Sequence, residues 1–235
     1  MLMDVDSIII TDDGTGVAKA LVEIMKANDI AATIADEIPS ECRGLVFLGG
    51  LKKVSSAEEA MDINRQAFLA AHKIAHSLAE QGGVFVTVQD TGGNFGLSQE
   101  IGDNVWLSGL SGLVKTAAIE WPKASVKAVD LARGASNPEK LAKEIFNELI
   151  SGGPELEVGI TSDGTRYRLE SYPEPIGQKG RTIDENSIIV ATGGARGVTA
   201  KTLIALAKES KPRLALLGRT TLGDELPFLK GAATD

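Results

Sequence analysis

One pattern occurs twice in this chain of 235 residues: a short run of β-branched apolar residues, a glycine-containing turn, and a helix that begins with Gly-Val. The first copy is SIII at 7–10 with Gly16-Val17, and the second is SIIV at 187–190 with Gly197-Val198. Consecutive apolar residues predict a strand, and apolar residues spaced three or four apart predict a helix. A repeated strand-turn-helix unit restricts the chain to few architectures.

The residues between the two copies continue this alternation. Further strands are predicted at 31–35, 44–48, 84–88 and 126–131, with helices at 57–80 and 107–120 between them. A later helix has a clear beginning and end, because Asn137 can cap it, Pro138 takes its first position and Gly152-Gly153 stops it. Strands alternating with helices predict an α/β fold with one doubly wound parallel sheet.

The pattern changes after residue 155. Residues 157–171 alternate in polarity around Asp163-Gly164, a dipeptide favoured in two-residue hairpin turns, which predicts a β-hairpin. Residues 172–186 have the composition of a linker. We therefore predict a first domain at 1–155, a linking hairpin at 156–172, a linker at 173–186 and a second unit at 187–235.

Composition narrows the function classes. The net charge of -8 and the pI near 4.9 argue against binding to nucleic acid, which needs clustered Lys and Arg. Cys42 is the only cysteine, as in proteins of a reducing compartment, and no apolar run approaches the ~18 residues of a membrane span. We expect a cytoplasmic protein with no membrane segment and a small polar ligand.

The turn of the second copy, TGGARGVT at 192–199, carries the strongest chemical signal. Glycines let the backbone approach a ligand closely, and free amides at a helix start favour a pyrophosphate. Arg219 follows the next predicted strand, where an acidic residue would bind the 2′-hydroxyl of NAD, so an arginine suits the 2′-phosphate of NADPH. Alternatively, Arg196 and Arg219 are ordinary solvated charges. The predicted cofactor-binding residues are Thr192, Gly193, Gly194, Arg196, Gly197, Val198 and Arg219.

The same residues resemble a known family. TGGARGVT resembles the TGxxxGxG loop of short-chain dehydrogenase/reductases, and residues 187–220 resemble the start of the catalytic subdomain of ketoreductases in modular polyketide synthases, most closely those of bacterial polyunsaturated fatty acid synthases. The resemblance implies a degenerate Rossmann-like structural subdomain followed by a catalytic one. It also implies a parent that reduces 3-oxoacyl groups on acyl carrier protein domains with NADPH. Thr199 departs from the pattern, because the family has its last glycine there, and this puts the close packing of helix and strand in doubt.

The first copy lacks the features that bind a dinucleotide. Its turn contains Asp12 and Asp13, and these carboxylates disfavour an anion, so we expect this copy not to bind a dinucleotide. A metal held by the two aspartates is the alternative, but no further ligands lie nearby in the sequence.

Two other patterns permit chemistry but have simpler explanations. The helix equivalent to the family's Tyr-xxx-Lys helix contains Ser111 and Lys115. One interpretation is that they are a nucleophile and a base. The simpler one is that the serine allows close packing and the lysine is a surface charge. His72 and His76 have the spacing of a zinc pair, without a third ligand, and an ordinary helical pair is the simpler interpretation.

No catalytic residue is therefore predicted in this chain. Residues 221–235 show no further strand, whereas a full cofactor domain has five or six, so we expect a truncated catalytic subdomain that is inactive alone and binds NADPH weakly or not at all. A non-catalytic scaffold or docking module of the synthase with no bound nucleotide is one alternative. A self-sufficient nucleotide-binding protein is another.

Overall fold

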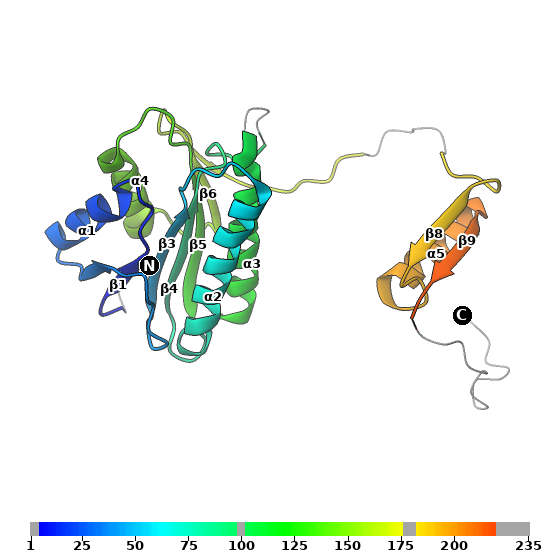
Figure 1. Ribbon diagram of the computed structural model, residues 1–235, viewed down its shortest axis with the longest axis horizontal. Coiled ribbons are helices and arrows are strands. Elements are labelled where there is room, and N and C mark those ends of the chain that lie inside the picture. The colour runs from blue at the N-terminus through cyan, green and yellow to red at the C-terminus, as the bar shows by residue number, and fades with distance from the viewer. Residues whose placement is uncertain (1–4, 98–101, 176–181, 220–235) are drawn as a thin grey trace. The chain divides into compact units, whose positions relative to one another are not determined.

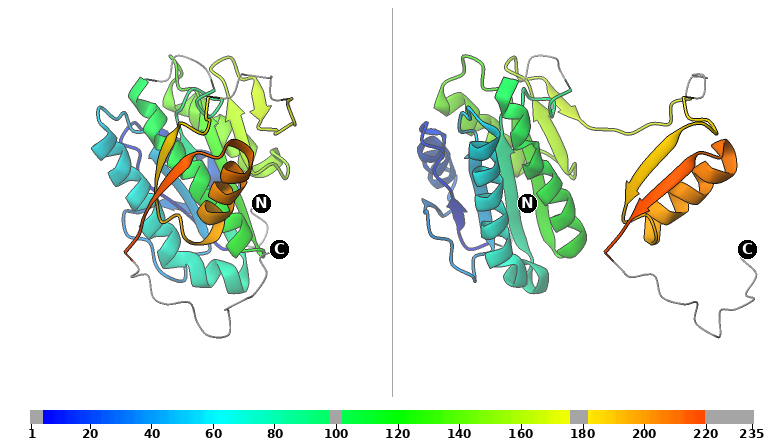
Figure 2. Two further views of the ribbon diagram at one scale, coloured as in Figure 1. Left: turned by 90° about the vertical axis from the view of Figure 1, so that its right-hand side faces the viewer. Right: turned by 45° about the vertical axis from the view of Figure 1, so that its right-hand side comes forward.

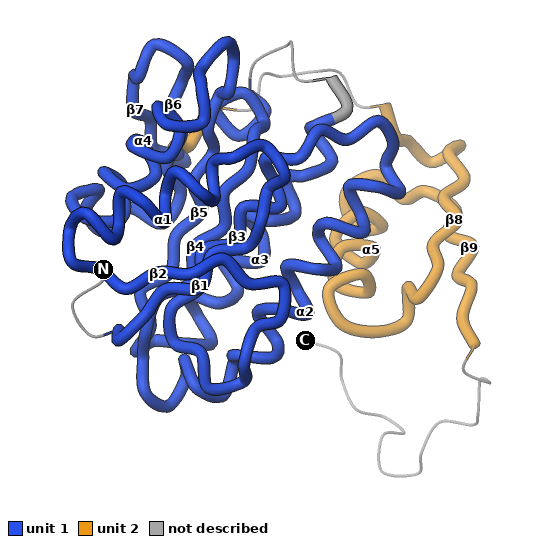
Figure 3. Tube along the Cα trace, turned by 60° about the vertical axis from the view of Figure 1, so that its left-hand side comes forward, with its two compact units in different colours: residues 1–171 blue, residues 172–235 orange. Residues whose placement is uncertain are grey.

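The computed structural model describes residues 5–97, 102–175 and 182–219. The chain divides into two compact units, residues 1–171 and residues 172–235 (Figure 3). The finer division that the sequence suggests, at residues 155, 172 and 186, stays a prediction.

The first unit is built on one sheet, in which seven strands are described in the order β2-β1-β3-β4-β5-β6-β7. All neighbouring strands are parallel except β6 and β7. The doubly wound α/β class predicted from the sequence is confirmed. The strands are β1 (Ile8–Ile10), β2 (Ala32–Ile34), β3 (Gly44–Gly50), β4 (Gly83–Gln89), β5 (Ala124–Leu131), β6 (Glu157–Ile160) and β7 (Arg166–Arg168).

Helices cover both faces of this sheet (Figure 1). On one face lie α1 (Val17–Ala27) and α4 (Pro138–Ser151), and on the other lie α2 (Ala57–Gln81) and α3 (Gly109–Glu120). The core forms two layers because the central strands are buried on both sides: Val46 and Val86 pack with the α1 and α4 side chains, and Phe85 packs with those of α2 and α3.

Local signals place both ends of α4. The side chain of Asn137 accepts a hydrogen bond from the backbone nitrogen of Lys140 at 2.9 Å and so caps α4 as predicted. The predicted helix at 107–120 begins two residues late, at Gly109, because residues 102–108 form the 3-10 helix η1 (Gly102–Ser108). A sequence pattern rarely separates these two helix types at a terminus.

The predicted hairpin forms, but its turn differs from the prediction. The backbone nitrogen of Thr161 donates to the carbonyl oxygen of Thr165, so the loop between them has three residues instead of two. Gly164 supplies the left-handed conformation at φ 87°, which is typical of a three-residue loop closed by a bulge. Asp163-Gly164 therefore predicts the hairpin correctly and the loop length wrongly.

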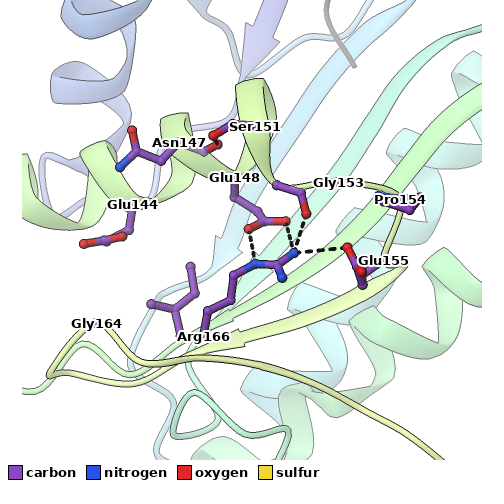
Figure 4. Close-up of a pocket in the computed structure, with 11 residues that line it drawn as sticks. Glu144, Asn147, Glu148, Ser151, Gly153, Pro154, Glu155, Gly164 and Arg166 are labelled. Carbon is purple, nitrogen blue, oxygen red and sulfur yellow. Dashed lines mark hydrogen bonds and ion pairs between the residues drawn. The ribbon is translucent and has the colours of Figure 1, made fainter.

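A buried ionic cluster fastens this hairpin to the rest of the unit. The Lys127 ammonium on β5 contacts the Glu148 carboxylate on α4 at 2.5 Å, and both side chains are almost fully buried. Arg166 on β7 pairs with the same carboxylate at 2.8 Å and with Glu155 at 3.3 Å, so its guanidinium points toward both acids (Figure 4). Both oxygens of Glu148 are thus engaged, and the cluster joins α4, β5 and β7.

The second unit is small. Its parallel strands β8 (Ile188–Thr192) and β9 (Arg213–Leu217) pair with each other, and α5 (Gly197–Ser210) lies alongside them (Figure 2). Leu203 is the buried side chain of α5, whereas the apolar residues Val198 and Ile204 are exposed. Within the described residues of the whole chain, we find no helix with the length and apolar character that crossing a membrane requires.

Candidate functional site

The glycine-rich turn of the second unit has two glycines in the left-handed conformation. Gly193 and Gly197 have φ values of 67° and 60°, which favour glycine. The backbone nitrogen of Gly193 donates to the carbonyl oxygen of Leu217 at 2.8 Å and so ties the turn to the end of β9. Arg196, the N-cap residue of α5, is extended and its side chain makes no capping hydrogen bond. The positive end of the α5 dipole therefore lies at the turn.

A cavity of about 740 Å³ lies against this turn. It brings together four of the residues predicted from the sequence: Gly193, Gly194, Arg196 and Arg219. Thr192, Gly197 and Val198 were predicted as well but do not line it; Gly197 and Val198 begin α5, and Thr192 ends β8.

The rest of the wall was missed by the sequence reasoning. It consists of Ala195, Leu216, Leu217 and Gly218. Their position in the sequence indicates such a role, because Leu216 and Leu217 end the strand that follows the motif. Ligands of open parallel sheets bind outside the carboxyl ends of strands.

Gly194 sets the distance between helix and strand. A Cβ atom at this position would lie 2.8 Å from Leu203 Cδ1 and 2.9 Å from Leu216 Cδ2, so only glycine fits without movement of these side chains. Thr199, which replaces the family's last glycine, is exposed in this unit. The close packing expected to suffer from Thr199 is instead provided by Gly194.

In the first unit the corresponding turn is occupied by its own side chains. One oxygen of the buried Asp13 carboxylate accepts from the backbone nitrogen of Ala18 at 3.0 Å, and the other accepts from the nitrogen and hydroxyl of Thr15. The carboxylate of Asp12 accepts from the nitrogen of Gly14 at 2.9 Å. Amides that would bind a phosphate are thus already paired with carboxylates.

The side chain of Arg133 also contacts this turn. Its Nη2 atom donates to the carbonyl oxygen of Leu51 at 2.8 Å and to the hydroxyl oxygen of Thr15 at 3.2 Å. Thr15 follows β1 and Leu51 follows β3, the two strands between which the strand order reverses. Nucleotides bind in Rossmann-like sheets at this reversal point, so the guanidinium lies across the entrance to such a site.

Three residues of the other candidate pairs, Ser111, Lys115 and His72, already have partners within the first unit. The Ser111 hydroxyl donates to the carbonyl oxygen of Ser108 at 3.1 Å, and the Lys115 ammonium pairs with Glu157 at 3.2 Å. His72 lies beside Phe68, with ring centroids 6.1 Å apart. In the part of the chain that the structure describes, no group of three or more His, Cys, Asp or Glu side chains has the arrangement of a metal site.

Comparison with known proteins identifies the fold. No protein-family model matches the chain. One subunit of the polyunsaturated fatty acid synthase of Thraustochytrium sp. is 26% identical over 239 residues, which cover 94% of this chain and 8% of that protein. A ketoreductase domain from the bacillaene assembly line is 17% identical with a TM-score of 0.55, covering 95% of this chain and 48% of its own. An N-terminal ketoreductase from the macrolactin assembly line is 12% identical with a TM-score of 0.59, covering 94% and 50%.

The chain has the fold of an assembly-line ketoreductase. The resemblance to ketoreductases of polyketide and polyunsaturated fatty acid synthases that residues 187–220 indicate is confirmed. The chain spans about half the length of the two solved ketoreductases and 8% of the synthase polypeptide. Within the ketoreductase fold, the first unit contains the turn filled by Asp13 and Arg133, and the second contains the open, glycine-rich turn.

Proposed function

We propose that this chain is part of an NADPH-dependent 3-oxoacyl-[acyl carrier protein] ketoreductase within a multidomain polyunsaturated fatty acid or polyketide synthase. The observation that carries the proposal is the cavity at the turn of the second unit, whose wall contains both glycine backbone and two arginines, Arg196 and Arg219. A dinucleotide with an extra phosphate needs this combination of close backbone and positive charge. The similarity in sequence to a polyunsaturated fatty acid synthase supports the synthase context.

The two units have different roles in this proposal. The turn of the second unit binds the pyrophosphate through the amides at the start of α5, and Arg196 and Arg219 bind the 2′-phosphate. Bound NADPH would supply a hydride to the 3-oxo carbon of the acyl chain. The first unit supports the catalytic half and binds no dinucleotide, because Asp13 occupies the amides of its turn.

We further propose that the chain alone is inactive and that its partners are the remainder of the catalytic subdomain and the acyl carrier protein domains of the synthase. The exposed apolar residues of the second unit support this. Val190 and Val198 are 63% and 81% exposed, which is typical of positions that further strands or helices cover.

The decisive experiment uses the chain extended along its parent sequence by about 200 residues, the size of a further domain. NADPH and NADH are titrated by fluorescence into this protein, into Arg219→Ala and into Arg213→Ala. We expect Arg219→Ala to weaken NADPH about tenfold or more, by loss of a charge-assisted contact to the 2′-phosphate, and to change NADH little. Arg213 is exposed at the beginning of β9, the strand that precedes Arg219, and lies outside the cavity, so it is the matched control.

The competing proposal is a scaffold or docking module of the synthase without a nucleotide. It requires that Arg219→Ala and Arg213→Ala behave alike and that the extended protein fails to bind NADPH. Reduction of a 3-oxoacyl thioester by the extended protein would reject it. Titration of NADP into the 235-residue chain, in which we expect weak or no binding, tests the hypothesis of a self-sufficient nucleotide-binding protein.

A further inference from the structure

The turn that follows β4 repeats the glycine spacing of the motif in the second unit. Residues 91–96 read TGGNFG and residues 192–197 read TGGARG, so a threonine, two glycines and a later glycine stand at the same intervals. Gly92, Gly93 and Gly96 have φ values of 93°, 73° and 79°. Turns with residues in this left-handed region can direct several backbone amides toward one point, which creates a binding site for an anion.

In this turn the carboxylate of Asp130 takes the place of an external anion. One of its oxygens accepts a hydrogen bond from the backbone nitrogen of Thr91 at 2.6 Å, and the other accepts from the backbone nitrogen of Phe95 at 2.6 Å. A third amide, that of Gly92, donates to Asp90 at 3.3 Å. The side chain of Asp130 therefore joins the two ends of the turn.

Burial makes these hydrogen bonds important. Asp130 lies on β5 and is fully buried, and a buried carboxylate needs partners in place of its hydration water. Burial raises the pKa of the Asp130 carboxyl, and the amides of Thr91 and Phe95 oppose this because they stabilise the charged form. Phe95 has a φ of 56°, which is unfavourable for a residue with a side chain. The turn therefore depends on the carboxylate to hold this conformation.

The closed turn also contacts the hairpin formed by β6 and β7. Gly159 on β6 is the register partner of Asp130. A Cβ atom at Gly93 would lie 2.5 Å from the carbonyl oxygen of Ile160, and a Cβ atom at Gly159 would collide with the carbonyl oxygen of Gly93. The two backbones are thus in direct contact. After this hairpin the chain leaves the first unit, so the turn lies against its last strands.

We propose that residues 91–96 form an anion site that the chain fills with its own Asp130 carboxylate, and that this internal ligand fixes the turn against β6. The ligand class is a small carboxylate, because the amides of Thr91 and Phe95 each bind one oxygen of the same group. This site does not depend on the ketoreductase role, since all of its residues lie in the first unit. The turn with the same glycine spacing in the second unit has a cavity beside it.

The test removes the internal ligand from the 235-residue chain and supplies a substitute. In Asp130→Ala we expect the amides of Thr91 and Phe95 to exchange hydrogen about tenfold faster or more, because each loses a charged acceptor, and the amides of β6 to exchange faster as well. Exchange is followed by NMR. Sodium formate, which supplies the missing carboxylate group, should restore slow exchange, whereas sodium chloride at the same concentration should not.

Two further variants make the result decisive. Asp130→Asn keeps one acceptor oxygen in the same volume, so one of the two amides should exchange faster, and formate should have no effect because the side chain fills the site. This variant also serves if Asp130→Ala does not fold. Asp13→Ala removes another buried carboxylate of the first unit and controls for a general loss of stability, so exchange should increase at Ala18 and not at Thr91.

Three results would overturn the proposal. The first is unchanged exchange of both Thr91 and Phe95 in Asp130→Asn. The second is a folded Asp130→Ala variant that does not respond to formate, or that responds equally to chloride. The third is faster exchange in the turn without any change in β6, which would show that the carboxylate does not fix the turn against this strand.

Discussion

The carboxylate of Asp13 accepts a hydrogen bond from the backbone nitrogen of Ala18 at 3.0 Å, at the first turn of α1. In the second unit the equivalent turn has a cavity beside it, and its N-cap side chain makes no capping bond. The same strand-turn-helix unit thus occurs in one chain with an internal anion in one copy and a cavity in the other. A carboxylate at a helix start stabilises the helix through its dipole and its free amides.

Removal of this carboxylate should destabilise the first unit. Asp13→Ala leaves the amides of Thr15 and Ala18 without their acceptor and should lower the free energy of unfolding by about 1–2 kcal/mol. Urea unfolding followed by tryptophan fluorescence measures this, since Trp106 and Trp121 both lie in the first unit. Asp12→Ala is the control, because Asp12 is exposed, and it should cost less than about 0.5 kcal/mol. Equal effects of the two variants would contradict the capping role.

Glu148 should be the most sensitive member of the ionic cluster. Glu148→Ala leaves the buried Lys127 ammonium without its carboxylate and should cost about 3–5 kcal/mol in urea unfolding. The double variant Lys127→Met/Glu148→Leu should recover most of this loss, since replacing a buried ion pair by apolar residues of similar volume costs little stability. Glu155→Gln is the control at the exposed end of the cluster. A double variant as unstable as Glu148→Ala would show that the loss arises from packing and not from the unpaired charge.

Asp90 should make stability depend on pH. Burial raises the pKa of the Asp90 carboxyl above its ordinary value, because desolvation outweighs the hydrogen bond from the Gly92 nitrogen and the nearby Arg133. The folded protein therefore binds this proton more tightly than the unfolded chain. The stabilisation is complete below the ordinary pKa of aspartate and is lost as the pH rises through the raised pKa of the folded state.

The variant Asp90→Asn isolates this effect. It removes the titrating group, so its free energy of unfolding relative to the original chain should increase as the pH is raised from about 4 to 8. Urea unfolding curves at several pH values give the difference. A constant difference across this range, or one of the opposite slope, would rule out a raised pKa at Asp90.

Gly194 should be less tolerant of a side chain than Gly218, which also lines the cavity. In Gly194→Ala the new Cβ would force Leu203 and Leu216 to move, which should increase hydrogen exchange at the amides of β8 and α5. Gly218→Ala is the control, since a Cβ there meets no atom within 4 Å. Because both tryptophans lie in the first unit, hydrogen exchange is the better measurement here. Equal exchange in the two variants would mean that helix and strand are not closely packed at Gly194.

The local features of this fold were predictable from the sequence, because they depend on neighbouring residues. Asn137 and Pro138 mark the beginning of α4, and the run at 44–48 falls within a buried strand. Asp163-Gly164 predicts a hairpin, but the loop length depends on which backbone groups pair, and Thr161 pairs with Thr165. Loop length is therefore a property of both strands and not of the dipeptide alone.

The candidate site was predictable only in part. The motif at 192–199 identifies the glycines, and the position of Arg219 after a strand brings it to the same cavity. From the sequence we expect the charge of Asp13 to disfavour a bound anion. In the structure its carboxylate also accepts hydrogen bonds from the amides of the turn, which its charge alone does not predict. Arg133 reaches Thr15 across 118 residues of sequence, and such a contact arises only when the sheet brings β1 and β5 into one layer.

The first sheet ends on each side in a strand of three residues, β2 and β7. An edge this short offers few unpaired backbone groups to a strand of another molecule, and β7 also carries the exposed charged side chain of Arg168. We therefore expect the short edge strands β2 and β7 to protect the sheet against edge-to-edge aggregation. In contrast, β8 presents Ile188 and Val190, both largely exposed. When this chain is produced on its own, we therefore expect its solubility to be limited by the second unit, and charged substitutions at Ile188 and Val190 to improve it.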